Sequence, residues 1–282
     1  MRRTVRVGAL STSAAGNALP PMLHAAEAGV EHLAALGAEL AILPELFAVP
    51  YVASDDPQHW RHLAEPLDGP TAQWAGALAR RLGVDILFGM ALDCDRARPV
   101  NAALLARRTG EVSVAAEKMR LPPRSGNDRF GEEDHFSAGA AKIQTVKIGA
   151  INVAVLICYD RRFAESWRQA ADAGADLVAV IVGGPAPNDP DGYFLTELQT
   201  YVRANGVYAF AACRTGVETI LGFPVRHDGE TVAIGPDGAV LSRQDTGGAA
   251  LADIDPEQVA EIREGRMAGH RLRSTQFSTS GQ

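Results

Sequence analysis

The run Ile151-Asn152-Val153-Ala154-Val155-Leu156-Ile157, followed at once by Cys158, decides the fold class of this chain. All of its residues except Asn152 are apolar, so a strand built from it is apolar on both faces. Strands of that kind lie in the middle of sheets that other layers cover on both sides. The run therefore predicts a central strand in a layered α/β protein, with Cys158 at its carboxyl end.

Segments of strand and helix type alternate along the rest of the chain. The expected strands cover residues 5–10, 40–43, 84–92, 101–107, 111–117, 143–146, 151–157, 176–182, 208–213, 231–234, 239–242 and 252–254; the expected helices cover residues 22–36, 71–82, 165–173, 192–205 and 256–266. A hairpin turn at Arg108-Thr109-Gly110 interrupts the alternation, with glycine where a positive φ is wanted. The pattern predicts an α/β layered fold with a mixed sheet, rather than a pure Rossmann fold or TIM barrel.

Length and composition restrict the class of protein. The chain has 282 residues, 46% of them hydrophobic, and no low-complexity linker, so we expect one domain over residues 1–282 with a polar tail from residue 269. A formal net charge of −7 argues against nucleic-acid binding. The longest apolar run, Ile148 to Cys158, is too short to span a membrane, and the first residues lack a signal peptide's apolar stretch. We expect a cytoplasmic protein with neither a nucleic-acid nor a membrane partner.

The sequence indicates neither a metal nor a cofactor. Its three cysteines, Cys94, Cys158 and Cys213, are too few and too scattered for a disulfide framework or a zinc cluster. The common phosphate-binding, dinucleotide-binding, zinc-protease and serine-hydrolase motifs are absent. His59 and His62 stand three residues apart, but no third ligand is indicated, so we interpret them as part of a solvated helix face.

Three polar residues with complementary chemistry follow apolar strands. Glu45 follows residues 40–43, Lys118 follows the second hairpin strand, and Cys158 follows residues 151–157. Ligands of α/β sheets bind at the carboxyl ends of the strands. A carboxylate there can take the proton of a thiol, and an ammonium can stabilise both the thiolate and the oxyanion that forms when sulfur attacks a carbonyl.

Each of these residues has a structural alternative. A buried cysteine is usually a small apolar residue, as we also interpret Cys213. A glutamate that follows a proline often caps a helix, and a lysine at a strand end is usually solvated. The spacing alone therefore leaves both readings of Glu45, Lys118 and Cys158 open.

The residues around the three positions resemble the carbon–nitrogen hydrolase (nitrilase) superfamily. The matching runs are Pro44-Glu45-Leu46-Phe47, Glu117-Lys118, Ile157-Cys158-Tyr159-Asp160-Arg161-Arg162-Phe163, Arg203-Ala204-Asn205-Gly206-Val207-Tyr208 and Gly235-Pro236-Asp237-Gly238. They occur in the family's order and extend from about Val5 to Ile254. The resemblance implies a four-layer α-β-β-α sandwich with mixed sheets.

The resemblance also implies a role for each site residue. Glu45 would be the general base, Lys118 the cation that stabilises the oxyanion, and Cys158 the nucleophile that forms a thioester with an amide or ureido carbonyl. The backbone N–H of Tyr159 would share the oxyanion. A second family glutamate corresponds to Glu132 or its neighbour Glu133, with the work of orienting Lys118 and positioning substrate or water.

The substrate is indicated less closely. The run from Cys158 to Arg168 is most similar to the N-carbamoyl-D-amino acid amidohydrolase branch, where tandem arginines contact the substrate carboxylate. That similarity implies substrate contacts for Tyr159, Arg161 and Arg162, and the alternative is that the arginines pair with neighbours such as Asp160 or Glu165. The chain departs from the branch at Met119-Arg120, where Arg120 offers a second anion contact. It also departs at Tyr159 and at Gly183-Gly184, where Gly183 leaves room beside the substrate.

Other functions of the same fold stay open. The chain has the residues expected of an ω-amidase or aliphatic amidase that acts on a carboxylate-bearing amide, because an amide and a ureido group differ little at the reacting carbon. A catalytically silent binding member is the remaining alternative, and it fits poorly with three intact reactive residues. The resemblance implies a homodimer or larger homo-oligomer.

Overall fold

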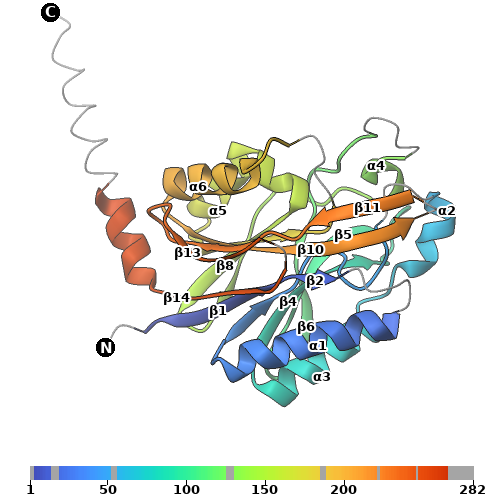
Figure 1. Cartoon of the computed structure of the whole chain (residues 1–282), viewed down its shortest axis with the longest axis horizontal. Coiled ribbons are helices and arrows are strands. Elements are labelled where there is room, and N and C mark those ends of the chain that lie inside the picture. Colours follow the sequence, from blue (N-terminus) through green and yellow to red (C-terminus); the bar gives the residue numbers. More distant parts are fainter. Residues whose placement is uncertain are drawn as a thin grey trace, which may run out of the picture.

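Two mixed β-sheets pack face to face, and a pair of helices covers the outer face of each sheet (Figure 1). This arrangement is seen in a computed structural model that describes residues 3–13, 19–51, 56–124, 130–184, 189–220, 223–245 and 247–265. The predicted four-layer α-β-β-α sandwich is confirmed. The predicted polar tail from residue 269 lies outside the described residues.

The first sheet has the strand order β14-β1-β3-β4-β5-β6. Its strands are β1 (Val5–Leu10), β3 (Leu40–Ile42), β4 (Asp85–Leu92), β5 (Val100–Ala106), β6 (Val112–Glu117) and β14 (Ala249–Ile254). Strands β1, β3 and β4 run parallel, while β14, β5 and β6 join by antiparallel pairing. Because β4 and β6 are both antiparallel to β5, β6 runs in the direction of β3 and β4.

The second sheet has the strand order β13-β12-β10-β9-β8-β7. Its strands are β7 (Thr145–Ile148), β8 (Ile151–Ile157), β9 (Leu177–Val182), β10 (Tyr208–Ile220), β12 (Thr231–Ile234) and β13 (Val240–Gln244). Strands β8, β9 and β10 are parallel. Two further strands, β2 (Thr12–Ser13) and β11 (Phe223–Asp228), pair with β10 off this path.

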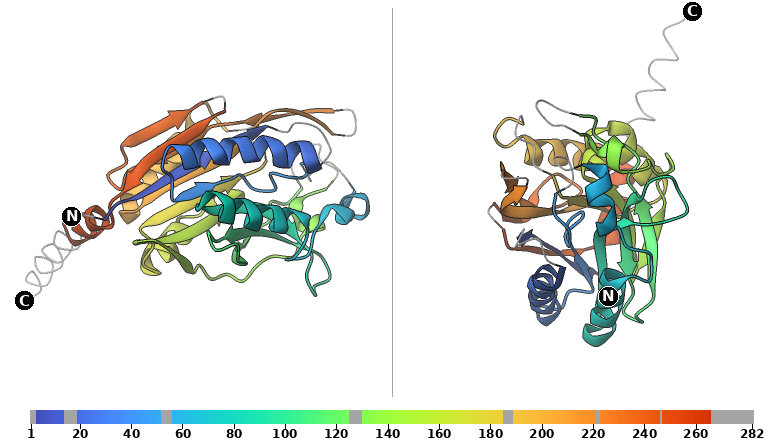
Figure 2. Two further views of the ribbon diagram at one scale, coloured as in Figure 1. Left: turned by 90° about the horizontal axis from the view of Figure 1, so that it is seen from below. Right: turned by 90° about the vertical axis from the view of Figure 1, so that its right-hand side faces the viewer.

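Apolar alternation explains the layers. Val7, Ile42, Val155 and Phe210 belong to one cluster, which fills the space between the two sheets. The opposite face of the first sheet packs against α1 (Leu19–Ala35) and α3 (Pro70–Leu82), which lie side by side in Figure 2, blue and teal. The second sheet packs against α5 (Ala164–Asp172) and α6 (Tyr193–Asn205). Since β8 and β9 have apolar residues on both faces, they contribute to two of these clusters.

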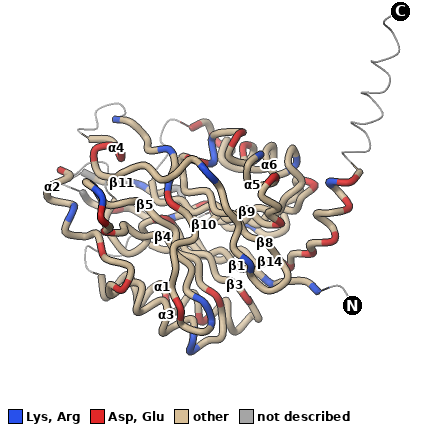
Figure 3. Tube along the Cα trace, turned by 180° about the vertical axis from the view of Figure 1, so that it is seen from behind, with Lys and Arg blue, Asp and Glu red and all other residues tan. Residues whose placement is uncertain are grey.

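The remaining short helices lie at one end of the sandwich or follow its strands. They are α2 (Pro57–Trp60), η1 (Arg61–Leu63), α4 (Glu132–His135) and η2 (Cys158–Arg162). Residues 256–265 form the predicted last helix as far as the described residues extend. In the view of Figure 3, basic and acidic positions are interspersed along the outer elements. None of the helices in the described part of the chain is long and apolar enough to cross a membrane.

The main differences from the sequence prediction lie in the second sheet. The strand predicted for residues 208–213 continues to Ile220 as β10, and β11, which pairs with its second half, was not predicted. Arg214, Glu218 and His227 lie in this hairpin and look like loop residues in a hydropathy pattern. They are nevertheless buried, because the Glu218 carboxylate contacts both Arg214 and His227.

Candidate active site

The strand directions bring four predicted site residues to carboxyl ends of strands. Glu45 follows β3 after two residues, and Lys118 follows β6 directly, at the same edge of the first sheet. Cys158 follows β8 and Gly183 follows β9, at one edge of the second sheet. Because the sheets pack face to face, residues from both edges meet over the core.

Lys118 is the centre of a buried ionic cluster. Its Nζ lies 2.8 Å from Oε1 of Glu45, and 2.8 Å and 2.7 Å from the two carboxylate oxygens of Glu132. All three residues are at most 4% exposed. Glu132 therefore contacts the lysine, whereas its neighbour Glu133 is exposed to solvent. One ammonium thus faces two carboxylates without water between them.

Asn101, at the start of β5, completes this cluster. Its Nδ2 donates to Oε1 of Glu45 at 2.7 Å and lies 3.5 Å from Oε2 of Glu132. Its backbone carbonyl accepts from the N–H of Lys118 at 2.8 Å. Asn101 was not found from the sequence, because a single asparagine at the start of a predicted strand carries no distinguishing pattern.

The electrostatics of the cluster follow from its burial. Burial by itself lowers the pKa of Lys118, but the charges of Glu132 and Glu45 outweigh it and hold that pKa well above 10.5. Burial raises the pKa of Glu132 from 4.5 to about 7, against the opposite effect of Lys118. The lysine is therefore a permanent cation, and Glu132 is poised to exchange a proton near neutral pH.

Two glycines make room for Glu45. A Cβ on Gly89 would lie 2.5 Å from Cα of Glu45, and a Cβ on Gly183 would lie 2.8 Å from its carbonyl oxygen and 3.0 Å from Oε2. The N–H of Gly183 donates to Oε2 of Glu45 at 2.7 Å. Gly183, predicted to leave room for substrate, thus fixes the second carboxylate oxygen of Glu45.

Cys158 and Leu46 are the non-glycine residues with positive φ in the described part of the chain, each at 47°. Such a conformation costs roughly 1–3 kcal/mol in a non-glycine residue and is typical of functional sites. Leu46 follows Glu45 directly, so both strained positions lie at the candidate base and the candidate nucleophile. The positive φ turns the chain sharply at the end of β8, and Cys158 as a whole residue is half-buried.

The charges around Cys158 favour the thiol form. Burial, followed by the negative charge of Glu45, raises the pKa of Cys158 from 9.0 to about 11, against the opposing charges of Lys118 and Arg161. Lys118 thus favours the thiolate, as expected from the sequence, but burial and Glu45 outweigh it, so the resting group is a thiol. Both carboxylates of the cluster act against the single ammonium.

Asp160 connects the turn after β8, which carries Cys158, to the two residues that follow Lys118. Its carboxylate accepts from the backbone N–H of Met119 at 3.2 Å and of Arg120 at 2.9 Å. Asp160 is 1% exposed, and burial raises its pKa from 3.8 to about 6 although these N–H groups oppose the rise. Residues from the two sheets are thereby connected directly beside the site.

The tandem arginines pair with carboxylates of the chain itself. Arg161 is 3% exposed; its Nη1 donates to the carbonyl oxygen of Cys158 at 3.0 Å. Its Nε lies 3.0 Å from Oε2 of Glu197, an ion pair without hydrogen-bond alignment. Arg162 donates to Asp189 at 2.6 Å. The partners suggested from the sequence, Asp160 and Glu165, are wrong, because α6 and the segment before it supply the carboxylates.

The other substrate-contact candidates lie around the same turn. The Tyr159 ring packs edge-on against Phe163, with ring centroids 5.2 Å apart. The Arg120 guanidinium lies over the same Phe163 ring at 4.3 Å and donates to Ser166 at 2.8 Å. Within the described residues, Arg120 has no carboxylate at salt-bridge distance, unlike Arg161 and Arg162.

Tyr51 is a site residue that the sequence did not reveal. Its phenol lies against Gly184, where a Cβ would be 2.9 Å from the ring and 3.0 Å from the hydroxyl. Burial raises the pKa of Tyr51 well above 10.0, and the charges of Glu132, Cys158 and Glu45 add to the rise. An aromatic residue six positions after Glu45 gave no signal, since only the fold brings it beside Cys158.

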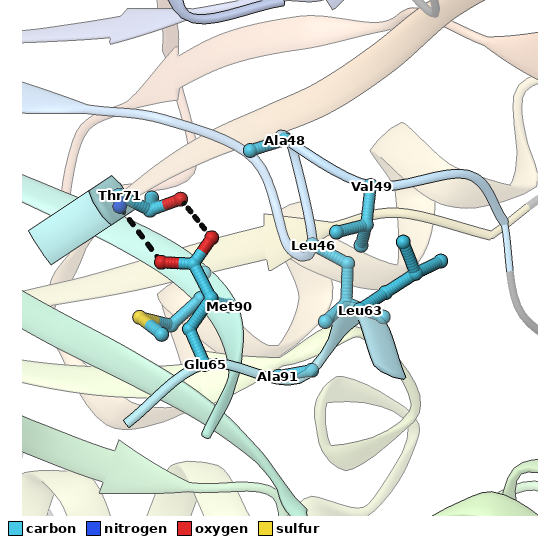
Figure 4. A pocket seen from close by; sticks show the side chains of 9 residues that line it. Leu46, Ala48, Val49, Leu63, Glu65, Thr71, Met90 and Ala91 are labelled. Carbon is cyan, nitrogen blue, oxygen red and sulfur yellow. Dashed lines mark hydrogen bonds between the residues drawn. The ribbon is translucent and has the colours of Figure 1, made fainter. Parts of the chain in front are cut away.

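The cavity drawn in Figure 4 is separate from this cluster. Leu46, Val49, Leu63 and Met90 line it, and Glu65 accepts from the backbone N–H and hydroxyl of Thr71 at its edge. With a volume of about 10 Å³ it has room for at most one water molecule. It contains none of the candidate catalytic side chains, so it is not a substrate site.

The described residues contain no candidate metal-binding site. No group of three or more His, Cys, Asp or Glu side chains there is placed to hold a metal ion. His59 and His62, the pair noted in the sequence, are both exposed, and Nδ1 of His62 contacts the carbonyl oxygen of His59.

Comparison with known proteins places this geometry in a family. A family profile described as carbon-nitrogen hydrolase matches residues 7–264. A hydrolase of Pseudomonas protegens, named for the 5′ region of pqqF, is 31% identical over 225 residues, covering 78% of this chain and 70% of the relative. An omega-amidase of Xenopus tropicalis is 28% identical over 247 residues and covers 83% of each chain.

A solved structure shows the same fold. The amidase of a Nesterenkonia species, in a variant with acrylamide added to its active site cysteine, superposes with a TM-score of 0.74. It is 21% identical and covers 94% of this chain and 99% of its own. Since the family profile covers nearly all of the described chain, this protein belongs to the carbon–nitrogen hydrolase family and is a hydrolytic enzyme.

Proposed function

We propose that this enzyme hydrolyses a small carboxylate-bearing amide through a thioester on Cys158, with Glu45 as general base and Lys118 as the oxyanion-stabilising cation. One observation carries the proposal. Glu45, Lys118 and Glu132 form a buried cluster with contacts of 2.7–2.8 Å, in electrostatic contact with a thiol that a strained turn presents after β8.

The raised pKa of Cys158 determines how the first step proceeds. Because the resting group is a thiol, the proton has to leave as sulfur attacks the substrate carbonyl carbon. The Sγ–C bond forms, the carbonyl π pair moves onto oxygen, and Glu45 accepts the thiol proton. The ammonium of Lys118 and the N–H of Tyr159 stabilise the resulting oxyanion.

The tetrahedral intermediate then collapses. The oxyanion re-forms the carbonyl, the C–N bond breaks, and the departing nitrogen takes the proton from Glu45 and leaves as ammonia. Glu45, again a carboxylate, takes a proton from water, whose oxygen attacks the thioester. The C–S bond breaks, the proton returns to sulfur, and the net reaction converts one amide and one water into one carboxylic acid and one ammonia.

Glu132 has a supporting role in these steps. Both of its oxygens hold the Nζ of Lys118, which aims the ammonium and leaves Glu45 to contact it through one oxygen only. With a pKa of about 7, Glu132 adjusts its charge as Glu45 gains and loses a proton. This change of charge lowers the electrostatic cost of each proton transfer to and from Glu45.

The charged groups near Cys158 favour an amide over an N-carbamoyl amino acid. Arg161 and Arg162, the carboxylate contacts of the carbamoyl branch, are paired with Glu197 and Asp189 here. Arg120 lacks such a partner among the described residues and lies two positions after Lys118. We therefore assign the substrate carboxylate to Arg120. The similarity to an omega-amidase supports the same substrate class.

Ammonia release from a substrate panel tests the proposal. The panel contains dicarboxylic acid monoamides, N-carbamoyl-D- and L-amino acids and simple aliphatic amides, with Cys158→Ala and Cys158→Ser as matched variants. We expect turnover of the monoamides and none in either variant. Turnover confined to the carbamoyl compounds would assign the arginines to substrate instead, and turnover by Cys158→Ala would exclude the thioester mechanism.

A silent binding member is the alternative that this panel also addresses. The intact cluster argues against it, since a buried ammonium with two carboxylates is costly to keep unless it is used. Mass spectrometry of the protein mixed with a turned-over amide and quenched in acid should show an acyl adduct on Cys158. A protein that binds the monoamides with neither adduct nor ammonia would be a binding member.

A further inference from the structure

The turn that carries Glu45 is anchored on its far side by three buried polar residues. Arg214 and Glu218 lie on β10 and His227 lies on β11, and they are 2%, 3% and 4% exposed. These side chains have no place in the mechanism proposed above. Isolated charges are not buried at such a position unless their contacts compensate the desolvation.

Arg214 holds the turn after Glu45 through its carbonyl groups. Its Nη1 donates to the carbonyl oxygen of Val49 at 2.9 Å and lies 3.5 Å from that of Leu46. Leu46 is the residue at φ 47°, directly after Glu45. A strained residue persists only where the surrounding contacts fix it, and Arg214 supplies such a contact.

Glu218 holds the other end of the same segment. Its two carboxylate oxygens accept from the backbone N–H of Tyr51 at 3.1 Å and 3.2 Å. Oε1 also accepts from Nη2 of Arg214 at 3.1 Å, and Oε2 lies 3.0 Å from Nε2 of His227. One carboxylate therefore joins the arginine, the histidine and the end of the turn.

His227 closes the arrangement from β11. Its ring packs edge-on against the Tyr51 ring, with centroids 5.8 Å apart, while its Nε2 is directed to Glu218. The histidine thus contacts both the carboxylate and the side chain of the segment that the carboxylate holds. Together the contacts fix residues 46–51 at both ends.

We infer that Glu218, with Arg214 and His227, is a positioning residue that holds residues 46–51 and thereby keeps Glu45 in register with Lys118 and Cys158. The inference rests on the proposed role of Glu45 as general base. None of the three residues touches the reacting atoms. Their effect is transmitted through the turn, since Glu45 is fixed by Lys118, Asn101 and Gly183 on one side and by this turn on the other.

Glu218→Gln tests the inference, because it keeps the shape of the side chain and replaces an acceptor by a donor. The single oxygen of an amide accepts from at most two of Tyr51, Arg214 and His227, so the cluster that holds the turn loses at least one of its hydrogen bonds. We expect kcat for the monoamide to fall about 10- to 100-fold, the cost of a misplaced base, while KM changes less. Cys158 should still react with iodoacetamide, because its turn is held by Asp160 and Arg161 instead.

Asp85→Asn is the matched control. Asp85 is 3% exposed, accepts from the backbone N–H of Arg108 at 2.7 Å, and pairs with the guanidinium of Arg108 at 3.3 Å. It lies at the start of β4, the strand end opposite to the site. Both variants should unfold at lower temperature than wild type, but only Glu218→Gln should lose kcat when assayed well below its unfolding midpoint.

A second variant covers failure of Glu218→Gln to fold. His227→Phe keeps a ring against Tyr51 and removes only the Nε2 contact, so Arg214 stays paired with Glu218; we expect a several-fold loss of kcat. Wild-type kcat in a folded Glu218→Gln or, where that variant does not fold, in His227→Phe would overturn the inference. So would equal losses in Glu218→Gln and Asp85→Asn. An active Cys158→Ala variant would contradict the proposed function itself. An inactive Cys158→Ala variant together with a fully active Glu218→Gln variant would contradict only the positioning role.

Discussion

Two clusters of charged residues flank Cys158, and they differ in their balance. On one side Lys118 faces Glu45 and Glu132, one cation against two carboxylates. On the other side Arg161 and Arg162 face Glu197 and Asp189, two cations against two carboxylates. Both clusters are built from side chains far apart in the sequence, yet only the first has an unmatched carboxylate.

The imbalance distinguishes a reactive cluster from a structural one. Where cations and carboxylates match in number, the charges balance without a proton transfer, and the contacts mainly hold elements together. In the Lys118 cluster, burial raises the pKa of Glu132 to about 7, the charge of Glu45 adds to the rise and the charge of Lys118 opposes it, so a proton becomes available near neutral pH. The comparison supports the proposed proton transfer in the Lys118 cluster and a structural role for the Arg161 cluster.

The largest effect should come from removing the base of the unbalanced cluster. Glu45→Gln keeps the shape and the contact to Lys118 but cannot accept a proton, so kcat should fall about 10²–10⁴-fold. Steady-state ammonia release with the preferred amide measures this. A fall of less than tenfold would show that another group, with Glu132 as the first candidate, takes the thiol proton.

The next effect concerns the thiol itself. With a pKa of about 11, compared with 9.0 for an unperturbed thiol, Cys158 has about 100-fold less thiolate near neutral pH. The rate of alkylation of Cys158 by iodoacetamide, followed by peptide mass spectrometry, should therefore still rise steeply at pH 10, where that of a thiol with a pKa of 9.0 levels off. In Glu45→Gln the profile should move to lower pH, because the charge of Glu45 raises this pKa.

A plateau near pH 10 in the wild-type protein would contradict the charge balance described above. It would mean that the ammonium of Lys118 outweighs the carboxylates at Cys158. The alkylation profile of the denatured protein is the control, since unfolding removes all three charges from the neighbourhood of the thiol.

Steric change at Glu45 should have a smaller effect than loss of its carboxylate. Gly183→Ala places a Cβ 2.8 Å from the carbonyl oxygen of Glu45, so the base or β9 has to shift. A displacement of this size costs about 10- to 100-fold in kcat. Gly265→Ala is the matched control, because nothing lies within 4 Å of a Cβ there. Equal kcat in the two variants would show that a Cβ at Gly183 is accommodated without displacing Glu45.

The central elements were predictable from the sequence, and so were the main candidate site residues. Residues 5–10, 151–157 and 231–234 form strands with the predicted bounds, because their apolar patterns admit no other buried arrangement. Glu45, Lys118 and Cys158 were singled out because they follow strands, Glu45 two residues after β3, and because the residues around them resemble a known family. Their mutual contacts depend on strand directions, which the pattern of segments only suggests.

The rest depended on pairings that no local pattern contains. Glu132 and Glu133 are adjacent and chemically equal, and only the short helix α4 directs the first to Lys118. Glu197 lies 36 positions after Arg161, so its ion pair was not anticipated. The second half of β10 was not predicted, because a hydropathy pattern scores Arg214 and Glu218 as polar and takes no account of the contact between them.

The smallest effect on turnover should come from the balanced cluster. Glu197→Gln removes a charge that pairs with Arg161 at 3.0 Å, while Arg161 keeps its contact to the carbonyl oxygen of Cys158. We expect the free energy of unfolding to fall by about 1–3 kcal/mol, because a buried guanidinium loses its counter-charge. The measurements are the thermal midpoint of unfolding and kcat, the latter taken well below that midpoint. A kcat loss as large as that of Glu45→Gln would mean that α6 takes part in the chemistry. A stability loss with nearly wild-type kcat would instead place the reacting charges on the Lys118 side of Cys158 alone.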